Sequence, residues 1–202
     1  VRQRAMLQEK GTVPHVLVLS ATPIPRTLVH VLYGDLDLSV IDSLPPGRTP
    51  IRTYCVPTSY RERVYRFIRK YAKSGCQSYV ICPLVEESEA KPDIRSVEEV
   101  YEELACGPLS GIRMGLLHGR MKAQDKDQVM KDFAAGRVQV LVSTTVIEVG
   151  VDVPNAVIMV IENADRFGLA QLHQLRGRVG RGDQPSFCIL ISDQKEEKAI
   201  AR

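Results

Sequence analysis

The segment Ile112–Ser143, IRMGLLHGRMKAQDKDQVMKDFAAGRVQVLVS, decides the fold of this chain. It opens with one short apolar run, Ile112–Leu117, and closes with another, Gln139–Ser143. The stretch between them, Ala123–Ala135, has the pattern of a helix and stops at Gly136, a residue type that commonly ends helices. Two short strands joined by a helix form a βαβ unit, in which the strands run parallel.

The same alternation of short β-branched runs and helical stretches continues outward in both directions. The further predicted strands are His15–Ser20, Arg52–Val56, Gln77–Cys82, Val157–Ile161 and Phe187–Ile191. The further predicted helices are Pro25–Tyr33, Ser59–Lys73, Ser96–Ala105 and Leu169–Leu175. We therefore expect an α/β fold with five or six parallel strands and helices on both faces of the sheet.

The composition is that of an ordinary globular protein of 202 residues, 44% hydrophobic and 25% charged. The net charge of +3 is small, so any contact with a polyanion must come from local basic patches. The five cysteines are scattered without a CxxC pair, which predicts a reducing, cytosolic compartment and no metal site. No apolar run approaches the length of a membrane span and no signal peptide opens the sequence, so we expect no membrane contact.

A cluster of arginines and glycines, RGRVGR, occupies residues 176–181. Guanidinium groups match the oxygens of phosphate groups, and Gly177 and Gly180 let the backbone approach a ligand closely. Arg176, Arg178 and Arg181 cannot share one helical face, so we expect the segment to leave its helix and to present arginines from a turn. A solvated basic loop is the alternative explanation of this pattern.

Small and polar residues follow several predicted strands where the chain leaves the sheet. These loops begin at Ala21, Cys82, His118 and Ser143, and the arginine cluster follows them in the sequence. Open α/β sheets bind ligands outside the carboxyl ends of their strands. We therefore expect all five segments to converge on one edge of the sheet.

These segments resemble the motifs of the second RecA-like motor domain of superfamily 2 helicases. Residues 20–22 are similar to motif III, residues 144–152 to motif V, and QLRGRVGR at 174–181 fits motif VI, QxxGRxGR, without a departure. Four segments are more similar still to the sequences of bacterial helicases that act at replication forks. They are residues 21–27, 118–121, 145–155 and 165–178. Translocases that couple transcription to repair are the nearest alternative.

The resemblance implies roles for individual residues. Arg178 and Arg181 match the arginine fingers that meet the γ-phosphate of ATP, and Gln174 holds the motif or the phosphates. The residues implied to bind ATP or to couple to motif VI are Gly150, Asp152, Ser20, Ala21 and Thr22. The residues implied to contact the DNA backbone are Thr144, Thr145, Cys82, Pro83, Gly119, Arg120 and Met121.

Several of these residues also have a purely structural explanation that the sequence leaves open. Asp152 can cap a turn, and Thr144 and Thr145 can pack as strand residues. His118, a lone histidine after a buried strand, is expected to be structural. The arginines and lysines of the helix 59–73 are expected to face solvent, with DNA as the alternative partner.

The motifs that hold ATP and Mg²⁺ are missing from the sequence, which contains no GxxxxGK[ST] loop and no Asp-Glu pair after a strand. We therefore expect ATP and Mg²⁺ to be bound mainly by a first motor domain outside this chain, and the chain alone to be inactive. By resemblance, residues 1–45 are the tail of that first domain and a linker. Residues 46–193 are the second motor domain, and 194–202 begin a helical coupling element.

The resemblance implies an ATP-dependent DNA helicase or translocase, cytoplasmic and associated with the bacterial nucleoid. Its expected partners are branched or double-stranded DNA, such as stalled forks and Holliday junctions, and the first motor domain and N-terminal DNA-binding domain of the same polypeptide. Two alternatives stay open. One is a translocase that couples transcription to repair, and the other is a non-catalytic module of helicase fold that binds nucleic acid or protein.

Overall fold

A computed structural model gives the structure of the chain and describes residues 39, 41, 50–84, 96–144 and 153–193. The chain divides into two compact units, Val1–Ile41 and Asp42–Arg202, and every element described below belongs to the second. The predicted elements His15–Ser20 and Pro25–Tyr33 lie outside the described residues, as does the predicted segment 194–202. The candidate site residues outside the described part are Ser20, Ala21, Thr22, Thr145, Gly150 and Asp152.

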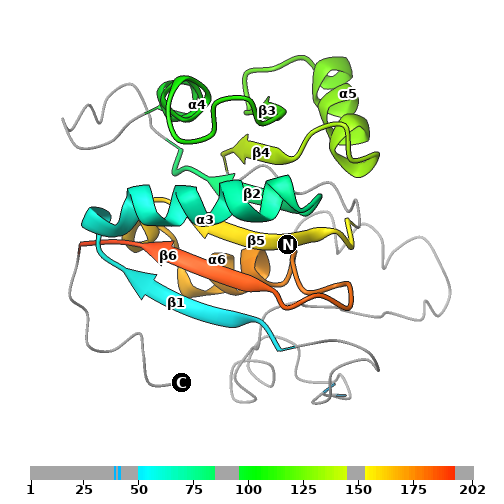
Figure 1. The fold of residues 1–202 in the computed structure, drawn as a ribbon. Helices are drawn as coiled ribbons and strands as arrows, with labels where there is room; N and C mark the ends of the chain where they lie inside the picture. Colours follow the sequence, from blue (N-terminus) through cyan, green and yellow to red (C-terminus); the bar gives the residue numbers. More distant parts are fainter. Residues whose placement is uncertain (1–38, 40, 42–49, 85–95, 145–152, 194–202) are drawn as a thin grey trace, which may run out of the picture. The chain divides into compact units, whose positions relative to one another are not determined.

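Six strands form one sheet in the order β1-β6-β5-β2-β4-β3, and every neighbouring pair is parallel (Figure 1). The strands are β1 (Arg52–Val56), β2 (Gln77–Ile81), β3 (Met114–Leu117), β4 (Val140–Ser143), β5 (Ala156–Ile161) and β6 (Phe187–Ile191). The helices are α3 (Arg61–Lys73), α4 (Val97–Cys106), α5 (Ala123–Ala134) and α6 (Leu169–Arg176), with 3-10 turns η1 (Thr58–Tyr60) and η3 (Ala164–Arg166). The predicted α/β fold with a parallel sheet is confirmed.

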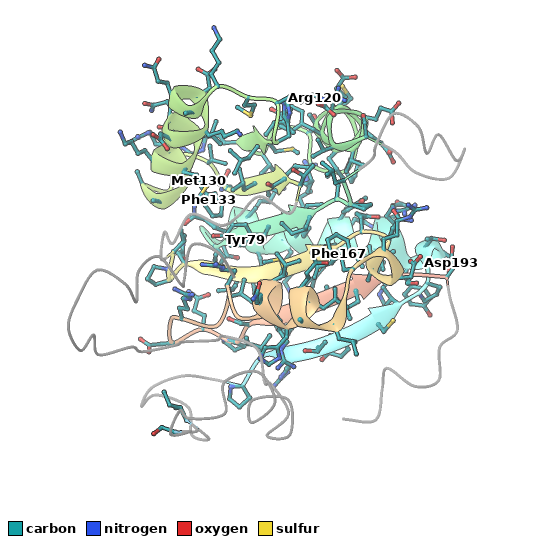
Figure 2. All side chains as sticks on the ribbon, turned by 180° about the vertical axis from the view of Figure 1, so that it is seen from behind. Tyr79, Arg120, Met130, Phe133, Phe167 and Asp193 are labelled. Carbon is teal, nitrogen blue, oxygen red and sulfur yellow. The ribbon has the colours of Figure 1, made fainter. Side chains whose placement is uncertain are left out.

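Each central strand sends alternate residues into two hydrophobic layers. In β2, Val80 packs in the layer that contains α3 and α4, whereas Tyr79 and Ile81 pack in the layer that contains α5 and α6. Figure 1 shows α3 in front of the sheet and α6 behind it. On the α5 side the rings of Tyr79 and Phe133 lie 4.9 Å apart, close to Met130 (Figure 2). Because both faces of the sheet are covered, the central strands β2, β4 and β5 are buried along their whole length.

Among the described elements, two boundaries differ from the prediction by two residues, for local reasons, and the others agree to within one residue. Ile112 was predicted to begin a strand, but its N–H donates to the Leu109 carbonyl at 2.9 Å, in a turn, so that β3 begins only at Met114. The helix predicted from Ser59 starts as the 3-10 turn η1 and becomes α-helical at Arg61. Both differences lie at element ends, where hydrogen bonds to a neighbouring turn compete with the regular ladder.

Candidate nucleotide and nucleic-acid sites

A cavity of about 260 Å³ opens at the carboxyl ends of β2, β3 and β4. It brings together four residues that the sequence predicted to contact DNA: Pro83, Gly119, Arg120 and Thr144. The remaining lining residues are Leu84, Ser96, Val97, Glu98 and His118. We call this space the carboxyl-edge cavity. Figure 2 shows Arg120 at the end of the molecule where β3 and α4 lie.

The amino end of α4 forms one wall of the carboxyl-edge cavity. Ser96 caps this helix, because its hydroxyl accepts the N–H of Glu99 at 3.1 Å and the Glu99 carboxylate accepts the N–H of Ser96 at 2.7 Å. This reciprocal capping box fixes where the helix begins. The positive end of the helix dipole therefore faces a cavity that Arg120 also lines, and these two groups suit an anionic ligand. The one carboxylate among the lining residues, that of Glu98, lies beside the His118 ring.

Thr144 lines the same cavity and carries an unpaired hydroxyl. The residue is only 4% exposed, and its N–H donates to the Leu117 carbonyl at 3.2 Å. Its Oγ1 atom is shielded from solvent and has no hydrogen-bond partner in the described part of the chain. Since most buried hydroxyl groups are hydrogen-bonded, this one is an exception whose donor and acceptor are unused at the wall of a cavity.

Residues 118–121 form a turn that is held by its own contacts. The N–H of His118 donates to the sulfur of Met121 at 3.4 Å, and the N–H of Met121 donates to the His118 carbonyl at 3.2 Å. The Lys126 ammonium group donates to the Gly119 carbonyl at 2.8 Å. The imidazole Nδ1 atom of His118 lies 3.6 Å from the Glu98 carboxylate. His118 and Met121 therefore shape the turn, whereas the exposed side chain of Arg120 extends from it.

Cys82 lies in a different position from the one its predicted role requires. The residue is fully buried in the core and is absent from the cavity lining, and its N–H donates to the Ser143 carbonyl at 2.8 Å. A thiol inside the core cannot touch a DNA phosphate. The predicted DNA contact at this point of the chain therefore rests on Pro83 and on main-chain atoms.

The arginine cluster leaves its helix as predicted. Helix α6 ends at Arg176, and Gly177 caps it. Beyond Gly177 the N–H of Arg178 donates to the Leu175 carbonyl at 3.0 Å, and Gly180 has a left-handed φ of 77°. The side chains of Arg178 and Arg181 are half-buried, and the Nε of Arg181 donates to the Gly177 carbonyl at 3.4 Å. Gln174 is exposed on α6.

The prediction that all five segments converge on one edge of the sheet is wrong for the arginine cluster. A Cβ atom at Gly180 would lie 2.8 Å from Ile51, and one at Gly182 would lie 2.7 Å from the Pro154 carbonyl. Ile51 and Pro154 precede β1 and β5, so the cluster ends at the amino edge of the sheet. The reason is that α6 runs back along the sheet after β5 and delivers the cluster to the start of β6.

Gly180 is needed both for its backbone conformation and for the space it leaves. Replacing Gly180 with alanine combines a left-handed conformation with a Cβ contact 2.8 Å from Cγ1 of Ile51. We expect the free energy of unfolding, measured by urea denaturation, to fall by about 2–4 kcal/mol. Gly136→Ala is the matched control, because Gly136 has a similar φ of 72° with nothing within 4 Å of the added Cβ. Equal losses for the two variants would show that the Ile51 contact has no effect.

Glu162 was not identified as important from the sequence, although it is the one carboxylate buried in the described core. It follows β5 directly and is 1% exposed. The Arg61 guanidinium donates to Oε2 of Glu162 from Nε at 3.0 Å and contacts it from Nη2 at 2.9 Å, and the Tyr65 hydroxyl donates to Oε1. A charged residue immediately after six apolar ones is the signal that could have revealed it.

The position of Arg61 corrects the prediction that the basic residues of this helix all face solvent. Burial lowers the pKa of the Arg61 guanidinium, but the charge and hydrogen bond of Glu162 outweigh this effect and raise that pKa above its ordinary value. Arg69 is also engaged, because it donates to the Pro108 carbonyl at 2.8 Å. The exposed cations of α3 are Arg63, Arg66, Lys70 and Lys73.

No group of three or more His, Cys, Asp or Glu side chains in the described part of the chain is placed to hold a metal ion. Nor does any helix found there have the length and apolar character needed to cross a membrane. All five cysteines are free thiols.

Comparison with known proteins places the chain among helicases. Residues 60–183, more than half of the chain, match the family described as "Helicase conserved C-terminal domain". The ATP-dependent DNA helicase RecG of Bacillus subtilis is 53% identical over 202 residues, which is 100% of this chain and 30% of that protein. RecG of Thermotoga maritima is 50% identical and is matched by 100% of this chain over 26% of its own length. The chain thus spans less than a third of the length of these relatives.

Solved structures agree with the observed fold. A structure of RecG bound to a three-way DNA junction matches with a TM-score of 0.74 and 50% identity, over 91% of this chain and 24% of that one. Yeast Dbp5 bound to RNA and ADP BeF3 matches with a TM-score of 0.55 and 19% identity, over 84% of this chain and 42% of that one. The second likeness supports the RecA-like fold alone. These similarities agree with the resemblance inferred from the motifs.

Proposed function

Because the chain belongs to the helicase conserved C-terminal domain family, we propose that it is the second motor domain of an ATP-dependent DNA helicase. Its substrate is branched DNA, such as stalled forks and Holliday junctions, and it acts in the bacterial cytoplasm at the nucleoid. Residues 46–193 form the motor domain, 1–45 end the first motor domain, and 194–202 begin a helical coupling element. The first motor domain and an N-terminal DNA-binding domain of the same polypeptide are its partners.

On this proposal the arginine cluster serves a nucleotide held mainly by the first motor domain. ATP and Mg²⁺ supply the phosphoryl group and the cation that neutralises it. Arg178 and Arg181 stabilise the negative charge that develops on the transferred phosphoryl oxygens, and Gln174 orients the segment. Both arginines suit this task because the turn after Gly177 holds them half-buried, so little order is lost when they meet a phosphate. Gly150 and Asp152 couple this segment to the DNA side.

On the same proposal, the carboxyl-edge cavity binds the DNA backbone. The amino end of α4, the Arg120 guanidinium and the Thr144 hydroxyl supply the charge and the donors that a phosphodiester accepts. The single observation that carries this assignment is the buried Thr144 hydroxyl that has no partner in the described chain. The arginine cluster and the cavity lie toward opposite edges of the sheet, so this domain can face a nucleotide and a DNA strand at the same time.

The proposal predicts that Thr144→Val weakens DNA binding without lowering the stability of the fold. Valine keeps the shape of threonine and removes only the unpaired hydroxyl, so the free energy of unfolding should stay unchanged or rise by up to about 1 kcal/mol. DNA affinity of the full-length protein, measured by fluorescence anisotropy with a labelled junction, should fall about 10- to 150-fold, the value of one hydrogen bond to a charged group.

Ser78→Ala is the matched control for this variant. The Ser78 hydroxyl in β2 is also buried without a partner, but it does not line the cavity. Its removal should leave DNA affinity unchanged. If Thr144→Val lowered stability and left DNA affinity intact, Thr144 would be a packing residue and the cavity would lose its assignment.

A further inference from the structure

A second hollow lies between the edge strand β1 and helix α3. In the strand order, β6 and β5 separate β1 from the strands β2, β4 and β3 that border the carboxyl-edge cavity. We call this second hollow the β1–α3 groove. It is lined by Tyr54, Val56, Tyr60, Arg63, Val64, Phe67, Phe187 and Ile189. Tyr54 and Val56 lie on the same face of β1 because their positions differ by two, and Arg63 and Phe67 lie on one face of α3 because theirs differ by four. None of the lining residues is acidic.

The groove has both exposed and packed aromatic rings. Tyr54 is 49% and Tyr60 is 46% exposed, high values for large aromatic side chains. Among the other lining residues, the Phe67 ring lies 4.7 Å from that of Tyr71 and 5.2 Å from that of Phe187. Exposed aromatic side chains offer π-faces on which a planar group can stack.

Positive charge surrounds these rings. The Arg63 guanidinium lies 5.9 Å from the centre of the Tyr60 ring. Lys70 continues the same stripe of α3 one turn beyond Phe67, and Arg52 shares the β1 face of Tyr54 by alternation. Two carboxylates on neighbouring elements have partners of their own: Glu62 lies 3.8 Å from Arg66, and Asp193 accepts both the N–H and the hydroxyl of Thr58.

We propose that the β1–α3 groove binds single-stranded nucleic acid as a second contact surface. Tyr54 and Tyr60 stack on bases, and Arg52, Arg63 and Lys70 meet the phosphates. The combination of exposed π-faces with cations favours this ligand, because an apolar peptide would be accommodated by the rings but would leave these cations unused. The proposal rests on the proposed function only in that the protein acts on nucleic acid.

The test measures binding of fluorescein-labelled oligothymidylate to the full-length protein by anisotropy over a range of salt concentrations. Tyr54→Ala should weaken binding about fivefold or more, the effect of losing one stacked base. Arg63→Ala should lower the magnitude of the logarithmic salt slope by about 0.7, the value for one phosphate contact on a single strand. Leu169→Ala and Lys131→Ala, at exposed positions on α6 and α5, should change neither quantity.

Footprinting with hydroxyl radicals identifies the occupant of the groove. Oxidation of Tyr54 and Tyr60 should fall only when oligothymidylate is added. Unchanged affinity of Tyr54→Ala and Arg63→Ala, or protection of both tyrosines before the oligonucleotide is added, would overturn the proposal. The second outcome would mean that protein fills the groove. Failure here is distinguishable from failure of the proposed function, because Thr144→Val tests the carboxyl-edge cavity independently with the labelled junction.

Discussion

Arg181→Ala in the full-length protein is expected to lower kcat for DNA-stimulated ATP hydrolysis by roughly 10³- to 10⁵-fold, the range for loss of an arginine finger. The KM for ATP should change little, because the first motor domain holds most of the nucleotide. The structure favours a loss of kcat without a change in KM. Arg181 lies in a turn after α6, half-buried and bonded through Nε to the Gly177 carbonyl, so contacts within this domain hold it in place. Steady-state kinetics with saturating DNA provides the measurement.

Arg176→Ala is the matched control for this prediction. Arg176 belongs to the same cluster and is also half-buried, but it is the last residue of α6 and its guanidinium lies 3.3 Å from the His173 ring. Its removal should change kcat by less than a few-fold. Equal losses of kcat in both variants would indicate a general electrostatic effect of the cluster. An unchanged kcat in Arg181→Ala would remove that residue from the finger role.

The elements of this fold could be predicted from the sequence because their signals are local. The six-residue apolar run of β5, the Ser96 cap of α4 and the glycine after α5 each depend on neighbours within a few positions. The gathering of Pro83, Arg120 and Thr144 followed from one general rule, that parallel strands end at a common edge.

What escaped prediction depends on residues that are distant in the sequence. The edge at which the arginine cluster lies depends on α6 being only eight residues long and on its direction along the sheet. The role of Glu162 depends on partners about 100 residues earlier, Arg61 and Tyr65, which one turn of α3 places on the same side. In the sequence of α3, Arg61 is one of several charged residues and Tyr65 is one of several residues on the apolar face. Only the packing of α3 over the end of β5 gives them a shared carboxylate.

Breaking the ion pair between Glu162 and Arg61 is expected to cause the largest loss of stability. Glu162→Ala removes the carboxylate that accepts from both the Arg61 guanidinium and the Tyr65 hydroxyl. We expect the free energy of unfolding to fall by about 3–5 kcal/mol, as for other buried pairs broken on one side. Urea denaturation at neutral pH gives this quantity.

The exposed pair Asp132 and Arg137 provides the matched control, since its atoms approach to 2.6 Å while the side chains stay 30% and 60% exposed. Asp132→Ala should cost at most about 1 kcal/mol, because solvent screens such pairs. The double variant Glu162→Leu with Arg61→Met should recover much of the loss, since removing both charges leaves neither one buried without a partner. Recovery would show that the cost of Glu162→Ala lies in the charge left on Arg61 rather than in lost packing. A double variant as unstable as Glu162→Ala would instead assign the stabilisation to the shape of the glutamate side chain and to its bond with Tyr65.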